Sequence, residues 1–158
     1  MLFLLFQIGG DRYALEARQA VEVLPYLSLK SIPQSPRGVA GIFNYRGHPV
    51  PAVDLSALTF GRPSHERLST RIIVIRYADQ SGKSRLLGLI AERATGMVRR
   101  DEREFVDAGV HSRTAPYLGP VFMDDKGAIQ LLRAQHLLAE SVGELYFTEH
   151  PQSDHEQG

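Results

Sequence analysis

The side chains of this chain that could do chemistry are its six histidines and their charged neighbours, and their spacing predicts no catalytic centre. The histidines are scattered along 158 residues, none at metal-ligand spacing with a partner. There is no cysteine, which excludes a thiolate nucleophile, disulfides and cysteine-ligated metal sites. No nucleophile elbow, phosphate-binding loop, dinucleotide-binding motif or H-E-x-x-H motif occurs. The sequence therefore predicts no enzyme, no metal and no cofactor.

Two polar clusters favour structural roles. Asp124-Asp125 stands just before Gly127, as in a hairpin turn. Arg99-Arg100 is followed by a mixture of acids and one further arginine, without interleaved aromatic residues. Basic and acidic residues number 18 each, so the formal charge is zero. Nucleic-acid binding requires an excess of positive charge, and we predict none here.

Arg46 and Glu22 are the polar residues whose roles stay open. Arg46 lies in a predicted tight turn, where it either ties the hairpin together or offers its planar guanidinium to an acidic group on a partner. Glu22 stands between Val21 and Val23, and the alternation predicts that it faces solvent. Pattern alone favours the structural role at Arg46 and a solvated role at Glu22.

The elements that must position these residues centre on the stretch from Gly41 to Leu55. It contains two short apolar strands, a turn over residues 45–48 with Gly47 free to take positive φ, and a helix start capped by Asp54. Pro49 and Pro51 lack N–H donors on the same side of their strand, which predicts a sheet edge. An edge strand is a place where another chain can dock.

Short apolar segments separated by turn residues recur along the rest of the chain, and a hairpin, strand and short helix follow Lys126-Gly127 as they follow Arg46-Gly47. This faint repeat predicts a mainly β fold of two small barrels packed together. Residues 13–24 remain ambiguous between helix and strand. The other predicted elements are strands over Leu2–Ile8, Arg71–Tyr77, Leu86–Ala91, Thr95–Arg99, Tyr117–Met123 and Ala128–Leu132, and a helix over Ala134–Ser141.

The apolar start of the chain predicts a buried strand. Residues 1–8 lack a basic flank and end at Gly9-Gly10, far short of the ~20 residues that cross a bilayer. We therefore expect no membrane insertion, and a cysteine-free chain is compatible with the cytoplasm. Residues 148–158 are polar and predict a flexible tail.

The order of several short motifs resembles the CheW-like family of coupling proteins, which join chemoreceptors to a histidine kinase. The most specific stretch is Asn44-Tyr45-Arg46-Gly47 followed by Val50–Leu55. Val21-Glu22-Val23 matches a further family segment, and the resemblance runs from Leu2 to Ser141. It implies two SH3-like five-stranded β-barrels around a shared hydrophobic core, with short helices, and it favours extended structure over residues 13–24.

The resemblance also implies domain limits and a function. We expect one domain over 1–147, with barrel one roughly 9–68 and barrel two roughly 69–141 plus the N-terminal strand. We expect a non-catalytic adaptor that binds the regulatory domain of a CheA-like histidine kinase and the cytoplasmic tip of a methyl-accepting chemoreceptor, in the cytoplasm within membrane receptor arrays. The positions that match partner-binding positions of the family are Glu22, Asn44, Arg46, Gly47, Ala94 and Met97.

Departures from the family pattern leave the pathway open. Glu92 and Arg133 stand where the family often has Asp, and Ala94 and Met97 stand where Val is usual. A CheW-like scaffold of a parallel chemosensory pathway, controlling surface attachment or a second messenger, is the alternative. A small β-barrel enzyme with an unrecognised site is the rival from another class.

Overall fold

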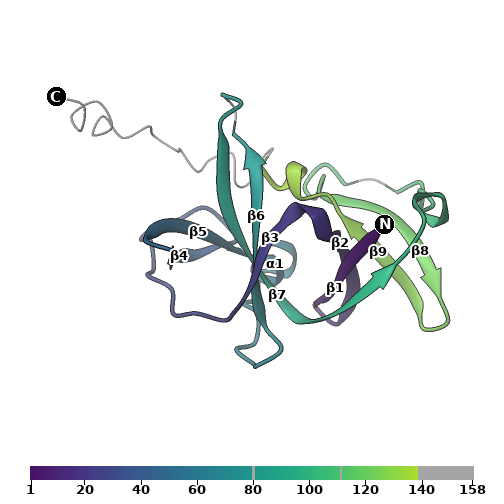
Figure 1. The fold of residues 1–158 in the computed structure, drawn as a ribbon, viewed down its shortest axis with the longest axis horizontal. Coiled ribbons are helices and arrows are strands. Elements are labelled where there is room, and N and C mark those ends of the chain that lie inside the picture. The colour runs from purple at the N-terminus through teal and green to yellow at the C-terminus, as the bar shows by residue number, and fades with distance from the viewer. Residues whose placement is uncertain (80, 111, 139–158) are drawn as a thin grey trace.

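The computed structural model describes residues 1–79, 81–110 and 112–138, and within them the chain is mainly β with short helices, as predicted (Figure 1). The predicted tail over 148–158 and the end of the predicted last helix lie outside the described residues. The elements in chain order are β1 (Leu2–Ile8), β2 (Asp11–Glu16), η1 (Ala17–Gln19), β3 (Ala20–Pro25), β4 (Val39–Tyr45), β5 (His48–Asp54), α1 (Leu55–Phe60), β6 (Arg71–Ala78), β7 (Ser84–Arg99), η2 (Glu102–Glu104), β8 (Leu118–Asp124), β9 (Gly127–Leu132) and η3 (Ala134–Leu138).

The strands form two five-stranded barrels that share β7. In barrel one the order is β3-β6-β7-β5-β4, and in barrel two it is β7-β1-β2-β9-β8. The first half of β7 pairs with β6 and β5, and its second half pairs with β1. Figure 1 shows β7 running from one barrel into the other. Arg93, at the transition, has a positive φ of 46°, and β7 continues through it as one strand where the sequence predicts two.

The pairing divides the chain differently from the predicted barrel limits of 9–68 and 69–141. Strand β6 and the first half of β7 belong to barrel one, because they pair with β3 and β5. Strand β2 belongs to barrel two, because it pairs with β1 and, in parallel, with β9. The two parallel pairings, β5 with β7 and β2 with β9, join segments that lie far apart in sequence. Local sequence patterns do not encode such partners.

The ambiguous segment over residues 13–24 is extended, as the resemblance implies: β2 ends at Glu16, a short 3-10 turn follows, and β3 begins at Ala20. Its helix-favouring composition is overridden by burial, because Tyr13, Ala14 and Leu15 pack into the cores of the molecule.

The central core lies between the two barrels. It joins Phe6 and Leu15 of barrel two to Ile73, Ile75 and Leu89 of barrel one. Strand β6 is buried on both faces, because Ile73 and Ile75 enter this shared core while Ile72 and Val74 enter the interior of barrel one. That double burial explains the unbroken apolar run from Ile72 to Ile75.

Asp54 fixes the connection after the β4–β5 hairpin. Its carboxylate is only 4% exposed and accepts hydrogen bonds from the backbone N–H groups of Ser56 and Ala57, which caps α1 as predicted. It also accepts bonds from the N–H and hydroxyl of Ser64, so the following loop folds back onto the helix start. The helix ends at Gly61 in the left-handed conformation.

A bidentate ion pair joins two distant turns of barrel two. The guanidinium of Arg12 donates to both carboxylate oxygens of Asp124, with the Nη1–Oδ2 distance at 2.7 Å. The Asp124 carboxylate also accepts from the N–H of Lys126. The hydrogen bond from Arg12 is the main cause that holds the pKa of Asp124 well below its usual value.

This ion pair predicts a loss of stability in acid. The pKa of Asp124 is lower in the folded than in the unfolded chain, so its contribution is complete above about pH 4 and declines as the pH falls toward the folded value. Urea unfolding between pH 7 and pH 2.5 should show a shallower decline for Asp124→Asn than for the wild type. Asp125→Asn, the exposed neighbour, should follow the wild type, and parallel curves for all three proteins would contradict this role.

Candidate protein-docking site

The structure brings Glu22 and Arg46 together, although they lie 24 residues apart. The Glu22 carboxylate oxygen Oε1 accepts a hydrogen bond from the Arg46 guanidinium at 2.9 Å and one from the Tyr45 hydroxyl at 2.8 Å. The Arg46 guanidinium lies over the Tyr45 ring, with its central carbon 5.3 Å from the ring centroid. We call Glu22, Tyr45 and Arg46 the mouth cluster, because it lies where strands β3 and β4 approach each other.

The mouth cluster links two strands that do not pair. Strands β3 and β4 are the outer strands of the barrel-one sheet, and among the described residues their pairing partners are β6 and β5. The side chain of Glu22 therefore spans a gap that backbone hydrogen bonds leave open. A carboxylate that accepts from two donors fills this role without an unpaired charge.

The prediction that Glu22 simply faces solvent is wrong. In the register Glu22 stands opposite Val74, whose side chain fills the interior of barrel one, so Glu22 points toward the same side. The two valines beside it point outward instead, with Val21 40% and Val23 37% exposed. Alternation gives the period of a strand but not which set of side chains faces inward, and here the inward glutamate is stabilised by Tyr45 and Arg46.

The hairpin that carries Arg46 is a two-residue turn with positive φ at both central residues, 51° at Arg46 and 86° at Gly47. Such turns suit the twist of a hairpin and favour Asn or Gly at both places. The side-chain oxygen of Asn44 accepts from the Gly47 N–H at 2.8 Å. Asn44 and Gly47, predicted as partner-binding residues, thus shape the turn that presents Arg46.

Arg46 adopts a backbone conformation that costs a non-glycine residue about 1 kcal/mol. Its side chain is 73% exposed, and Glu22 accepts from one of its five N–H donors. The guanidinium therefore has donors left for a further acceptor.

Two arginines, Arg46 and Arg76, act on the Tyr45 hydroxyl beside Glu22. The hydrogen bond to Glu22, followed by burial, raises the pKa of the Tyr45 hydroxyl, and the positive charges of Arg46 and Arg76 oppose that rise. Two arginines thus act near one carboxylate. An acidic or polar acceptor on another molecule would complete this arrangement.

Pro49 and Pro51 mark a sheet edge only in part. His48 to Pro51 pair with β4 alone, Ala52 and Val53 pair with both β4 and β7, and Asp54 pairs with β7. The prolines thus precede the point where the strand enters the sheet interior. The outer strand is β4, and its outer side meets Lys30 in a single backbone bridge at Ile42.

Ala94 and Met97 do not join the mouth cluster. Ala94 is 9% exposed, belongs to the core between the barrels and donates its N–H to the carbonyl of Ser69. Its side chain contacts the core and offers no surface to a partner. Met97 is 56% exposed and stands opposite Leu4 of β1, in barrel two.

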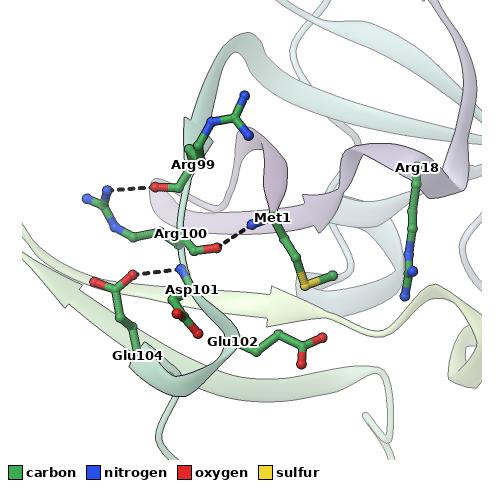
Figure 2. Close-up of a pocket in the computed structure, with 7 residues that line it drawn as sticks. All are labelled: Met1, Arg18, Arg99, Arg100, Asp101, Glu102 and Glu104. Carbon is green, nitrogen blue, oxygen red and sulfur yellow. Dashed lines mark hydrogen bonds between the residues drawn. The ribbon is translucent and has the colours of Figure 1, made fainter.

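A polar pocket beside the chain start lacks the arrangement of an active site. Its lining includes no histidine, and two of its acids take part in local bonds, since Glu104 accepts from the Asp101 N–H and Asp101 pairs with Arg103. Figure 2 shows the Arg99 and Arg100 side chains directed away from Glu102 and from Arg18, so the charges do not converge. Among the described residues no group of three potential ligands could hold a metal ion. The pocket is lined by Met1, Arg18, Arg99, Arg100, Asp101, Glu102 and Glu104.

Tyr45 and the outward valines are the candidate residues that sequence reasoning missed. Tyr45 follows buried Phe43 at the spacing of inward-facing residues, and its position before the turn places its hydroxyl at the barrel mouth. The sequence feature that could have identified Tyr45 is its polar hydroxyl on an otherwise apolar, inward-facing set of side chains.

Comparison with known structures defines the class of this fold as a pair of SH3-like β-barrels. The scaffolding protein TtCheW from Thermoanaerobacter tengcongensis superposes with a TM-score of 0.74 at 22% identity, covering 87% of this chain and 86% of that one. In sequence, 98 residues are 31% identical to the chemotaxis protein CheW of Helicobacter pylori, covering 61% of this chain. That match spans 56% of the Helicobacter protein, little more than half its length.

The CheW-like domain model matches residues 2–142. The chain therefore belongs to the CheW-like family. Within the part of the chain that the structure describes, no helix is long and apolar enough to span a bilayer.

The mouth cluster predicts a measurable change at Tyr45. Replacing Glu22 by Ala removes the hydrogen-bonded carboxylate, so the raised pKa of Tyr45 should fall toward its ordinary value near 10. Titration of ring-labelled tyrosine by NMR measures this directly. Glu16→Ala, a change on strand β2 of barrel two, serves as the control, and an unchanged pKa of Tyr45 in Glu22→Ala would show that the bond does not form in solution.

Proposed function

We propose that this protein is a non-catalytic adaptor that couples a methyl-accepting chemoreceptor to a CheA-like histidine kinase. Membership of the CheW-like family supports the proposal, as do the similar proteins named for chemotaxis and scaffolding. An adaptor of this kind works on the cytoplasmic side and reaches the membrane through its receptor. It contacts the kinase through the regulatory domain and the receptor through its cytoplasmic tip.

The observation that carries the proposal is the presentation of Arg46. A strained backbone position holds an exposed guanidinium with unused donors at the tip of a rigid hairpin. Neither the turn nor the ion pair with Glu22 requires arginine there, because Asn or Gly suits the turn better and an exposed ion pair contributes little. Strain retained at an exposed cation is typical of a recognition residue.

The surface around Arg46 suits a helical partner with an acidic group. The outward valines of β3, Val21 and Val23, supply apolar contact, and the exposed Arg46 guanidinium supplies attraction for a carboxylate. An amphipathic helix offers both apolar and acidic side chains. We therefore assign this surface to the receptor tip and leave the kinase to another face of the protein.

We also propose that this protein catalyses no reaction. In the polar pocket Asp101 and Glu104 are held in local bonds, and the side chains of Arg99 and Arg100 point away from Glu102. The mouth cluster pairs its carboxylate with two donors and so leaves no free general base.

Arg46→Asn separates recognition from folding. Asn-Gly is the favoured pair for this turn, so the melting temperature should be unchanged or higher. Affinity for a receptor fragment should fall roughly 30-fold, the equivalent of losing an interface anchor of about 2 kcal/mol. Isothermal calorimetry with the fragment, and separately with the kinase regulatory domain, measures both contacts, and only receptor binding should weaken.

The matched control is Arg103→Asn, because Arg103 is also exposed and also paired with an acid, Asp101, at 2.8 Å. This variant should bind the receptor fragment like the wild type. Equal affinity of the Arg46 and Arg103 variants would exclude Arg46 as an anchor. An unfolded Arg46→Asn protein would show instead that the arginine holds the hairpin together.

A further inference from the structure

We propose that Tyr45 is the positioning residue of this docking surface: its ring and hydroxyl together hold the Arg46 guanidinium in one orientation before a partner arrives. The inference rests on the proposed function, because it concerns the arginine that the partner is expected to bind. It goes further because it assigns the orientation of the Arg46 guanidinium to Tyr45, a residue that contacts no partner itself.

The Tyr45 ring is a fixed platform. It is 7% exposed and packs in the interior of barrel one with Val50, Ile72 and Val74. Phe43 meets it edge to face, with the ring centroids 6.5 Å apart. A ring packed into a close-packed core has little freedom to move.

Two contacts of Tyr45 restrict the movement of the Arg46 side chain. The ring face lies under the guanidinium at 5.3 Å, and the hydroxyl donates to Glu22 Oε1 at 2.8 Å. The same oxygen of Glu22 accepts from Arg46 at 2.9 Å. Tyr45 therefore fixes the arginine directly through its ring and indirectly through the carboxylate that its hydroxyl orients.

Without this platform Arg46 would be a loosely held side chain. Its side chain is 73% exposed, and an exposed ion pair alone does not order two long side chains. Ordering the arginine before binding removes an entropy cost that the complex would otherwise bear. A change at Tyr45 should therefore alter how long the complex lasts more than how fast it forms.

Tyr45→Phe isolates the hydroxyl, because the ring and its packing remain. In the free full-length protein, ¹⁵N relaxation of the Arg46 Nε–H should show a well-ordered guanidinium in the wild type and a less ordered one in Tyr45→Phe, which keeps the ring contact but loses the hydroxyl. Tyr117→Phe is the control, since it removes a different buried tyrosine hydroxyl, the one bonded to Thr59 at 3.0 Å. It should leave the order of Arg46 unchanged. Equal order of Arg46 in the wild type and Tyr45→Phe would overturn the inference.

Binding then shows whether Tyr45 acts through Arg46. Tyr45→Phe should weaken affinity for the receptor fragment about fivefold, the size expected for one hydrogen bond, mainly through faster dissociation. In an Arg46→Asn background the same change should have no further effect. Equal losses in both backgrounds would show a direct or purely structural role and overturn the inference.

The two proposals fail separately. A wild-type protein that binds no receptor fragment would refute the proposed function, while the relaxation measurement would still decide whether Tyr45 orders Arg46. Glu22→Gln provides a second variant should Tyr45→Phe lose its fold. It keeps the shape of the network, removes the charge, and should also release Arg46; an Arg46 that stays ordered would count against the inference.

Discussion

The structure depends on one strand that serves two sheets. Strand β7 is 16 residues long, and its two halves complete different barrels. The core beneath it draws residues from both barrels, among them Phe6, Leu15 and Ile73. Neither barrel can move away without breaking that strand or exposing that core, because a packed interior does not deform gradually. Surfaces on the two barrels are therefore held at a fixed spacing, which is what an adaptor between two partners requires.

Local features of this fold could be predicted from sequence because local chemistry determines them. The turn at Arg46-Gly47, the cap at Asp54 and the Ile72–Ile75 strand all follow from residues next to one another. The assignment of strands to barrels could not be predicted, since it rests on two parallel pairings between distant segments, β5 with β7 and β2 with β9. The sequence also predicts two strands where β7 is one, because the register shift between β7 and β1 near Arg93 depends on the partner strand.

The candidate site was predictable in position but not in orientation. Resemblance pointed to Glu22 and Arg46, and the structure shows them bonded to each other and to Tyr45. It gives Asn44 the task of shaping the turn and buries Ala94 in the core. Which way a strand residue faces depends on packing from the opposite strand, so sequence alternation could not tell that Val21 and Val23 point outward. Under the proposed function, recognition falls to this small cluster at one end of barrel one.

The most direct test of the adaptor account is a three-component reconstitution with a receptor signalling fragment and a CheA-like kinase, both from the native cell. Autophosphorylation of the kinase is measured with and without this protein, and the mass of the assembly is recorded by light scattering. The account predicts a complex that contains all three chains and a kinase rate that responds to the receptor only when this protein is present. A kinase that responds equally without it, or a protein that joins neither partner, would contradict the account.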